Sequence, residues 1–205
     1  MRIIAGTYRG RPLVGPPSDQ VTRPITDRAK QALFDALGTL DELPWVLDCF
    51  SGPGSMGLEC LSRGSKFALF VERDHHAQRA LKTNITALQL TAQTHVLTCD
   101  AYGAGLQTAL RNKRAELGPL GLAFLDPPYK HMETGHERRR MDELTRFMAQ
   151  EIMRPDGLII IRHPTRVMVD TTVTCTQIFR EMKFSEMAIT WLIPAENRQH
   201  EPVAL

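Results

Sequence analysis

Short apolar runs alternate with segments of helical periodicity from Pro44 onward, and this alternation restricts the folds that the chain can adopt. The runs that we expect to be strands, each followed by a helical stretch, are Trp45–Phe50, Phe67–Val71, His95–Cys99, Gly121–Leu125 and Leu158–Ile161. Strands that alternate with helices pair in parallel. The sequence therefore predicts an α/β fold with a largely parallel sheet and helices on both of its faces.

The expected helices and two last strands complete this pattern. Helices are expected from Ser55 to about Arg63, from His75 to Leu88, from Tyr102 to Arg114, and around Met141, Leu144, Met148 and Ile152. The final apolar runs, on either side of Lys183-Phe184-Ser185, are Cys175–Arg180 and Met187–Ile193. Too few residues join these two runs for a crossover connection, so the pair must be antiparallel. The whole pattern predicts a seven-stranded, mostly parallel sheet.

The first residues form a separate, basic segment. Two short strands, Arg2–Ala5 and Arg11–Val14, are expected to form a hairpin around Thr7-Tyr8-Arg9-Gly10. A helix follows from about Asp27, with Thr26 or Asp27 as its N-cap, and ends near Gly38. Only Asp19 and Asp27 balance the basic residues of this segment, which are Arg2, Arg9, Arg11, Arg23, Arg28 and Lys30.

Composition narrows the class of protein. Of 205 residues, 42% are hydrophobic and 23% charged, as in a globular protein of one domain. No apolar run approaches the roughly 20 residues that span a bilayer, and no signal-peptide core follows Arg2. The cysteines, none of them in a CxxC pair, are Cys49, Cys60, Cys99 and Cys175. We therefore expect neither a metal site nor a disulfide, and a cytoplasmic protein with reduced thiols and no membrane partner. The net charge of +2 permits a nucleic-acid partner but supports one only weakly.

A glycine-rich loop follows the first expected strand of the sheet and opens a helix. Its sequence is Asp48-Cys-Phe-Ser-Gly-Pro-Gly-Ser-Met-Gly57. Glycines let the backbone turn sharply there and let a ligand approach closely. Glu72 ends the next strand, where a carboxylate can accept hydrogen bonds from ribose hydroxyls. Together they predict a nucleotide-binding crevice; the alternative is a glycine-rich turn beside a surface glutamate. The absence of a GK[ST] sequence excludes a P-loop.

The glycines alone do not choose the ligand, because the loop also satisfies the G-x-G-x-x-G pattern of dinucleotide sites. Pro53 removes a backbone N–H from the place where a pyrophosphate needs donors. Asp48 adds a negative charge at the mouth of the loop, which suits the ammonium group of S-adenosylmethionine and repels a pyrophosphate. We therefore expect S-adenosylmethionine, bound by Asp48, Phe50, Ser51, Gly52, Gly54, Glu72, Arg73, Asp100 and Ala101. Asp100 could meet the adenine amino group or cap the next helix, and the sequence leaves both interpretations open.

Asp126-Pro127-Pro128-Tyr129 follows the fourth expected strand and is the most specific motif of the chain. An exocyclic amino nitrogen of a base is a poor nucleophile because its lone pair is delocalised into the ring. The Asp126 carboxylate and a neighbouring carbonyl, that of Pro127, can accept its two N–H bonds and free the lone pair for attack on a sulfonium methyl. The prolines fix that carbonyl, and Tyr129 offers a face on which a base can stack. The four residues are therefore the expected catalytic residues; the alternative is a proline-rich strand exit with a buried tyrosine.

Further motifs carry a resemblance to a known family. In chain order they are Met1-Arg-Ile-Ile-Ala-Gly6, Thr22-Arg-Pro-Ile-Thr-Asp-Arg28, Leu33-Phe34, the loop from Asp48 to Glu59, Leu61-Ser-Arg-Gly64, Phe70-Val-Glu72, Asn84 and Phe124-Leu-Asp-Pro-Pro-Tyr129. From Met1 to about Ile193 the chain resembles the 16S ribosomal RNA guanine-N2 methyltransferase family (RsmD-like). The Thr-Arg-Pro block singles out this family, whereas Asp-Pro-Pro-Tyr is shared with many amino-methyltransferases.

The resemblance implies a class I methyltransferase (Rossmann-like) fold and S-adenosylmethionine as the methyl donor. It implies that the substrate is guanine N2 in RNA of an assembling small ribosomal subunit. We expect residues 1–38 to be an RNA-contacting extension, residues 39–194 the catalytic domain and residues 195–205 a loose tail, in a monomeric protein. The residues expected to contact RNA are Arg2, Arg9, Arg11, Arg23 and Arg28. Arg23 and Arg28 could instead organise the crevice.

The sequence departs from the family pattern in three places. Ser51 and Pro53 stand where alanine and serine or threonine are usual. The polar stretch from Lys130 to Arg140 is longer than the usual connection, and Arg162 ends the fifth strand where an acidic residue is common. The polar stretch and Arg162 lie at the expected entrance of the substrate site. These two departures therefore concern which nucleotide is methylated more than which cofactor is bound.

Other interpretations remain for some residues and for the whole chain. His131 and His136 could contact RNA or lie in a solvated loop, and Arg138-Arg139-Arg140 could bind phosphate or form a surface run. An adenine-N6 methyltransferase of DNA would use the same motifs but normally carries a separate target-recognition region. An NAD-linked oxidoreductase would leave Asp-Pro-Pro-Tyr unexplained. A non-catalytic RNA-binding relic would not need Glu72, Asp126 and Tyr129.

Overall fold

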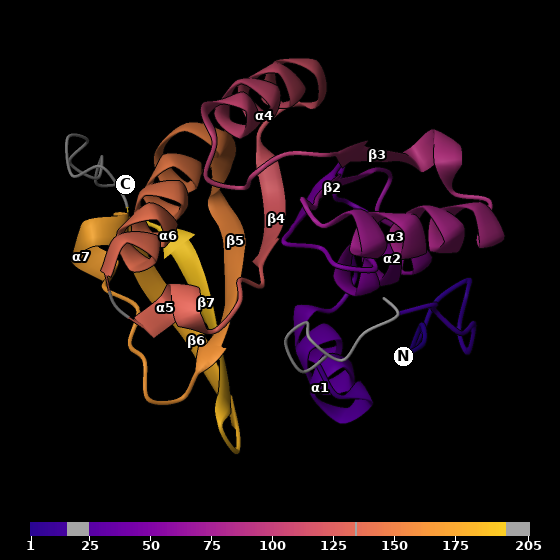
Figure 1. Cartoon of the computed structure of the whole chain (residues 1–205), viewed down its shortest axis with the longest axis horizontal. Helices are drawn as coiled ribbons and strands as arrows, with labels where there is room; N and C mark the ends of the chain where they lie inside the picture. Colours follow the sequence, from indigo (N-terminus) through magenta and orange to yellow (C-terminus); the bar gives the residue numbers. More distant parts are fainter. Residues whose placement is uncertain (16–24, 134, 196–205) are drawn as a thin grey trace, which may run out of the picture.

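A seven-stranded sheet in the order β3-β2-β1-β4-β5-β7-β6 forms the centre of the protein (Figure 1). The computed structural model describes residues 1–15, 25–133 and 135–195. The strands are β1 (Val46–Cys49), β2 (Ala68–Val71), β3 (Thr94–Leu97), β4 (Leu120–Leu125), β5 (Met153–Pro164), β6 (Thr176–Phe184) and β7 (Met187–Pro194). In the sheet, β3, β2, β1, β4 and β5 follow one another and each pairs in parallel with the next, whereas β7 is antiparallel to both β5 and β6. The predicted α/β fold with a mostly parallel sheet is confirmed.

Helices cover both faces of this sheet. They are α1 (Asp27–Leu37), α2 (Ser55–Ser62), α3 (His75–Ala87), α4 (Ala104–Leu117), α5 (Lys130–Glu133), α6 (Gly135–Phe147) and α7 (Thr171–Thr174). A 3-10 turn spans Thr91–Gln93, and a π turn, Met148–Ile152, continues α6. Figure 1 shows α1, α2 and α3 on one side of the sheet and α4 and α6 on the other. None of the helices within the described residues has the length and apolar character that crossing a membrane requires.

Two hydrophobic cores follow from the alternation of side chains along each strand. Val46 and Phe70 point to the face covered by α1, α2 and α3, whereas Leu47 and Leu69 point to the opposite face. The strands β1 and β4 are buried along their whole length. Continuous burial of this kind is what a parallel strand between two helical layers requires, and it explains why these strands are apolar apart from Asp48 of β1.

The strand order positions a ligand site. From β1 the chain moves outward through β2 and β3, then returns to place β4 on the other side of β1. The loops that leave β1 and β4 therefore diverge to opposite faces, and a crevice opens outside the carboxyl ends of these strands. Asp48 is in β1, and Asp126 directly follows β4, so both of these predicted site residues meet at this switch point.

The N-terminal hairpin forms, but without the two strands expected from the sequence. Arg2 and Pro12 make an isolated antiparallel bridge, and the N–H of Leu13 donates to the carbonyl of Met1. The N–H of Ile3 donates to the carbonyl of Arg11, and the N–H of Gly10 donates to the carbonyl of Ile3. The N–H groups of Ile4 and Ala5 instead donate to the Glu59 carboxylate of α2. The two arms are therefore joined by cross-strand bonds around Arg2 and Pro12, but Ile4 and Ala5 bond to α2, and the strands are shorter than predicted.

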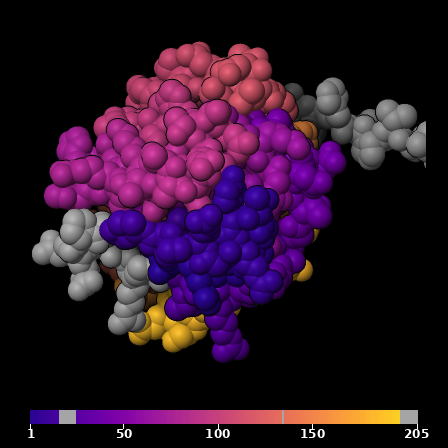
Figure 2. Space-filling view, turned by 90° about the vertical axis from the view of Figure 1, so that its right-hand side faces the viewer, coloured from indigo at the N-terminus to yellow at the C-terminus, as the bar shows by residue number. Residues whose placement is uncertain are grey.

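The N-terminal segment (residues 1–14) is bound to the surface of α2 and α3. The N–H of Tyr8 donates to Ser62 Oγ, and the side chain of Asn84 bonds to both the N–H and the carbonyl of Val14. In Figure 2 the segment, in indigo, lies beside the magenta surface that includes α3. Helix α1 follows the prediction closely, with Thr26 as N-cap and Gly38 after its last turn.

Candidate active site

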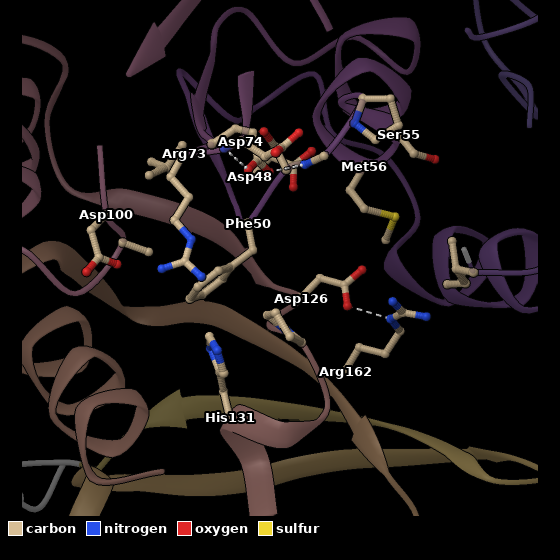
Figure 3. A pocket seen from close by; sticks show the side chains of 18 of the residues that line it. Asp48, Phe50, Ser55, Met56, Arg73, Asp74, Asp100, Asp126, His131 and Arg162 are labelled. Carbon is tan, nitrogen blue, oxygen red and sulfur yellow. Dashed lines mark hydrogen bonds and ion pairs between the residues drawn. The ribbon is translucent and has the colours of Figure 1, made fainter. Parts of the chain in front are cut away.

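A pocket of about 390 Å³ lies at the carboxyl ends of the parallel strands (Figure 3). The residues expected to bind the cofactor that line it are Asp48, Phe50, Ser51, Gly52, Glu72, Arg73, Asp100 and Ala101. Asp126 and Pro128 of the expected catalytic motif line the same pocket. In Figure 3, Arg73 and Asp100 lie at one end, Asp126 and Arg162 lie at the other, and Phe50 lies between them. The structure therefore brings the glycine loop and the Asp-Pro-Pro-Tyr motif to one cavity.

Two glycines of the loop, Gly52 and Gly54, have positive φ angles, and the absence of a side chain has a different consequence at each. Gly52 has φ 53° and faces open space, so its backbone is accessible to a ligand. Gly54 has φ 88°, and a Cβ there would lie 2.4 Å from Leu81 Cδ1. Gly54 does not line the pocket. Its absence of a side chain serves the packing of the loop onto α3, which sequence alone did not distinguish from ligand contact.

Glu72 connects the glycine loop with the loop after β2. One carboxylate oxygen accepts the N–H of Gly52 at 2.8 Å and the other accepts the N–H of Asp74 at 2.8 Å. A carboxylate has about four acceptor positions, so these two bonds leave capacity for ribose hydroxyls. The position of Glu72 on the pocket wall agrees with the role expected from its place after the second strand.

Asp48 lines the pocket but is more buried than the sequence suggested, with a residue exposure of 1%. Its Oδ2 accepts the N–H of Gly57 at 2.8 Å, because the start of α2 folds over it. Burial raises the pKa of Asp48 to about 8, and the neighbouring Asp126 and Glu72 add to the shift. At neutral pH the carboxyl group is therefore mostly protonated unless a cation lies beside it. The negative charge expected at Asp48 from the sequence therefore requires a cationic group of the ligand beside it.

Asp100 is held by a partner that the sequence did not predict. Its Oδ2 lies 2.7 Å from Arg140 NH2, and its Oδ1 accepts the N–H of Tyr102 at 3.2 Å. Burial raises the pKa of Asp100, but the bonds from Arg140 and Tyr102 outweigh burial and the net pKa is lowered. Helix α4 starts at Ala104 with a Gly103 N-cap, so the helix-capping interpretation of Asp100 is wrong.

An aromatic wall closes one side of the pocket; Phe50 was expected there from the sequence, but its contacts with Tyr102 and His131 were not. Phe50, with φ 63°, lies 5.4 Å from the ring of Tyr102 and 6.4 Å from the ring of His131. His131 is only 4% exposed, and its Nδ1 lies 3.0 Å from the Tyr102 hydroxyl. Burial lowers the pKa of His131, so the ring is neutral at physiological pH. The solvated-loop interpretation of His131 is therefore wrong; its position directly after Asp-Pro-Pro-Tyr was the available signal.

The long polar stretch after Tyr129 folds into α5 and the start of α6 instead of remaining a loop. Arg138 is paired with Asp142 at 2.9 Å and donates to the carbonyls of Met132 and Met168. Arg140 lies over the ring of Tyr102 at 4.6 Å in addition to its bond with Asp100. Arg140 thus supports the pocket wall through Asp100, Arg138 joins α5, α6 and the chain around Met168, and Arg139 is exposed.

The catalytic motif begins at the mouth of the pocket. The N–H of Asp126 donates to the carbonyl of Cys49, which anchors the strand exit to β1. The carbonyl of Pro128 accepts the N–H of His131, so the carbonyl of Pro127 is the remaining candidate acceptor for an amino group. Asp126 Oδ1 lies 2.6 Å from Arg162 Nε, and the Arg162 guanidinium lies 5.5 Å from the centre of the Tyr129 ring. Pro127 and Tyr129 do not line the pocket itself.

The arginines expected to contact RNA lie away from the pocket lining. Arg9, Arg11 and Arg28 are exposed, but Arg2 pairs with Asp27 at 2.8 Å. The N-terminal cluster is therefore not free of acidic neighbours, because α1 brings Asp27 back to it. Arg23 falls outside the described residues. Among the residues that the structure describes, no group of three or more His, Cys, Asp or Glu could hold a metal ion.

Comparison with known proteins identifies the family. The family "Conserved hypothetical protein 95" matches residues 1–193. YlbH of Bacillus subtilis, which bears a provisional name as an rRNA methyltransferase, is 36% identical over 84% of this chain and 88% of its own length. Ribosomal RNA small subunit methyltransferase D of Escherichia coli is 34% identical over 63% of this chain and 61% of its own length.

Solved structures of methyltransferase-like proteins have a similar fold. The structure of yhhF from Escherichia coli, provisionally described as a methyltransferase, has a TM-score of 0.74 and 25% identity over 95% of this chain and 98% of its own. SMU.776, a provisional methyltransferase complexed with SAH, has a TM-score of 0.63 and 13% identity over 82% of this chain and 50% of its own; it shows a shared fold only. The family match and the identity to YlbH show that this chain belongs to the Conserved hypothetical protein 95 family, which is the RsmD family that the sequence motifs indicated.

Proposed function

We propose that this protein transfers a methyl group from S-adenosylmethionine to the exocyclic N2 amino group of a guanine in small-subunit ribosomal RNA. One observation carries the proposal. The Asp126 carboxylate and the glycine loop face a single pocket at the switch point between β1 and β4. An amino group at Asp126 and a nucleoside-like donor on the glycine loop would therefore be neighbours.

The chemistry of the pocket lining fits S-adenosylmethionine better than a dinucleotide. The acidic residues of the lining are Asp48, Glu72, Asp74, Asp100 and Asp126. Carboxyl groups in this number suit a ligand with an ammonium and a sulfonium and disfavour the two charges of a pyrophosphate. Glu72 would hold the ribose hydroxyls, Asp48 the methionine ammonium and Asp100 the adenine amino group. Phe50 and His131 would pack on the adenine ring.

The residues of the chain prepare the amino group for transfer. S-adenosylmethionine, when bound, supplies an electrophilic methyl group on its sulfonium. Asp126 and the Pro127 carbonyl accept the two N–H bonds of the amino group and draw its nitrogen toward tetrahedral geometry. Preorganised acceptors of this kind stabilise the positive charge that develops on the nitrogen during attack. The amino group then loses one proton to Asp126 or to water, and the methylated amine leaves.

The choice of base and RNA rests on the family. Its Escherichia coli member is named as a small-subunit rRNA methyltransferase, and the exposed Arg9 and Arg11 offer phosphate contacts. We propose a monomer that acts on RNA of the assembling subunit, a reaction that belongs to the cytoplasm. We also propose residues 1–38 as the RNA-contacting extension and 39–194 as the catalytic domain.

The test is a methylation assay with labelled S-adenosylmethionine. Undermethylated small ribosomal subunits, free small-subunit RNA and DNA would each be incubated with the protein, followed by identification of the methylated nucleoside. N2-methylguanosine from the ribosomal substrate is the expected product. N6-methyladenosine from DNA would replace the proposed reaction with the alternative one, and no transfer to any substrate would remove it.

A further inference from the structure

Arg162 lies beside the catalytic carboxylate because of the register between two parallel strands. Leu125 at the end of β4 pairs with Ile161 of β5. The next residue of each strand, Asp126 and Arg162, is therefore brought to the same edge of the sheet, and the Asp126 Oδ1–Arg162 Nε distance is 2.6 Å. Figure 3 shows the pair at one end of the pocket. The Arg162 side chain is only 7% exposed, whereas that of Asp126 is 26% exposed.

The same guanidinium contacts a second residue of the motif. It lies 5.5 Å from the centre of the Tyr129 ring, and Arg162 NH1 lies 3.8 Å from Met187 Sδ on β7. A planar guanidinium that is packed on a ring and bonded to a carboxylate has few rotamers left. Arg162 thus ties Asp126 and Tyr129 into one rigid unit, which a solvated lysine could not do.

The charge of Arg162 opposes the effect of burial on Asp126. Burial raises the pKa of Asp126 above its ordinary value, and the charge and hydrogen bond of Arg162 offset part of that rise. The other ionisable groups of the surrounding pocket walls are Asp48 from β1, Glu72, Arg73 and Asp74 after β2, Asp100 after β3, and Lys130 and His131 from α5. Without Arg162, Asp126 would therefore protonate more readily, and a protonated carboxyl is a poorer acceptor for an amino group.

We propose that Arg162 is a positioning residue for methyl transfer, which fixes the orientation of the Asp126 carboxylate and keeps it charged when the amino group arrives. The inference rests on the proposed function for its kinetic consequence. Its electrostatic part concerns Asp126 alone and can be measured without a substrate.

The first measurement is the titration of the Asp126 carboxyl by carbon NMR, with the resonance assigned from Asp126→Asn. In Arg162→Met we expect the Asp126 pKa to rise by about 1–3 units, because an adjacent opposite charge is worth that much. Arg162→Lys keeps a positive charge and should keep the pKa close to that of the parent. Arg111→Met is the matched control: Arg111 also pairs with a carboxylate, Glu151 at 2.8 Å, and covers a ring, that of Phe147, but lies outside the pocket lining.

The second measurement is single-turnover methyl transfer as a function of pH, beside a binding titration of S-adenosylmethionine. Arg162→Met should move the acid limb of the rate profile to higher pH by the same amount as the carboxyl pKa, with cofactor affinity unchanged within about twofold. Arg162→Lys should leave the limb in place and lower the plateau about tenfold, because it loses the fork that orients the carboxylate. Arg111→Met should match the parent protein.

Three results would overturn the inference. In Arg162→Met, the Asp126 pKa and the acid limb of the rate profile could both stay where they are in the parent, or the rate of methyl transfer could fall by the same factor at every pH. Faster methyl transfer in that variant would instead mean that Arg162 obstructs the reaction. If Arg162→Met does not fold, Arg162→Gln, which is also neutral and can still donate a hydrogen bond, takes its place. If the parent protein transfers no methyl group, the proposed function fails. The carboxyl titration still decides whether Arg162 keeps Asp126 charged.

Discussion

The carboxyl groups that line the pocket differ from one another in burial and in the groups that they bind. Asp48 is buried and bonded to a backbone N–H, and its pKa is raised to about 8 by burial. Asp100 and Asp126 each face an arginine, whereas Glu72 binds two backbone N–H groups of the adjoining loops. Burial, an opposite charge and hydrogen bonding are the three causes that shift a carboxyl pKa. Burial dominates at Asp48, whereas at Asp100 and Asp126 an arginine opposes the effect of burial.

Asp126→Ala should remove turnover and leave the cofactor bound. The loss of one preorganised acceptor typically costs about 10²–10³ in kcat. Tyr129→Phe should be nearly silent if the ring acts by stacking, and Tyr129→Ala should weaken base capture more than chemistry. Single-turnover transfer and a cofactor titration for each variant check this. A fully active Asp126→Ala protein would exclude the amino-methyltransferase mechanism, and an inactive Tyr129→Phe would assign the role to the hydroxyl.

Glu72→Ala should weaken S-adenosylmethionine binding by about 1.5–3 kcal/mol, the loss expected for charge-assisted hydrogen bonds. Glu72 also accepts the N–H of Gly52, so the variant should loosen the glycine loop. Glu72→Gln keeps one acceptor oxygen and should lose less affinity. Calorimetric titration of the parent and both variants provides the test, and equal affinities in all three would remove Glu72 from the site.

The ionisation of Asp48 should make stability depend on pH. In the unfolded chain an aspartate ionises near pH 4, whereas in the folded protein burial raises the pKa of Asp48 to about 8. Between these values the folded state binds more protons than the unfolded state, so the stability that this group contributes falls as pH rises through that interval. Asp48→Asn cannot ionise and keeps an acceptor for the Gly57 N–H.

We therefore expect Asp48→Asn to be more stable than the parent protein by about 3–5 kcal/mol at pH 8, with the difference becoming small near pH 4. Urea denaturation at both pH values measures it. Asp156→Asn, at an aspartate whose side chain is 77% exposed, is the control and should give no pH-dependent gain. A destabilised Asp48→Asn protein at pH 8 would mean that the carboxylate is charged and stabilising in the folded state.

At the scale of elements, helices α2 and α3 join the N-terminal segment to the glycine loop through buried polar contacts. Lys30 of α1 pairs with Glu59 of α2 at 2.9 Å, with side-chain exposures of 2% and 0%. Lys30 Nζ also donates to Ser55 Oγ, at the start of α2. Asn84 of α3 donates to the carbonyl of Pro53 in the glycine loop as well as to that of Val14. The extension is therefore part of the scaffold that holds the cofactor loop.

Glu59→Gln should destabilise the protein by about 3–5 kcal/mol, because it leaves the Lys30 ammonium buried without its counter-charge. The double variant Lys30→Met/Glu59→Gln should cost less than the sum of the two single changes, since the unpaired charge is then gone. Urea denaturation of the four proteins of this cycle gives the coupling free energy. Additive losses would show that the two side chains do not stabilise each other.

The strands and helices of the sheet were predictable from sequence, whereas the polar contacts between them were not. Periodicity identified β1 and α2 because burial on both faces of β1 leaves a nearly uninterrupted apolar run. The hairpin strands are shorter than predicted, and the N–H groups of Ile4 and Ala5 bond to Glu59, more than 50 positions away, a contact that the local pattern does not contain. The pairing of Asp126 with Arg162 depends on the register of two strands, which a sequence pattern does not contain.

At the scale of the whole molecule, a modest net charge of +2 hides an uneven distribution. The N-terminal segment exposes Arg9 and Arg11, and its backbone is bound to α2 and α3. Deleting this segment would remove the Ile4 and Ala5 N–H groups from Glu59 and the Val14 backbone from Asn84, so a truncated protein would lose stability together with any RNA contact. Point substitutions at the exposed arginines separate the two effects.

Arg9→Gln/Arg11→Gln should weaken RNA binding and flatten its dependence on salt. Each phosphate contact releases about one counterion, so the slope of log affinity against log salt should fall by roughly one for each arginine that binds a phosphate. Arg111→Gln/Lys113→Gln removes the same charge from α4, on the opposite side of the sheet (Figure 1), and should keep the parent slope. Filter binding of small-subunit RNA over a range of salt concentrations measures both. Equal slopes for the two double variants would mean that the N-terminal arginines make no phosphate contact and that the segment serves only to hold α2 and α3.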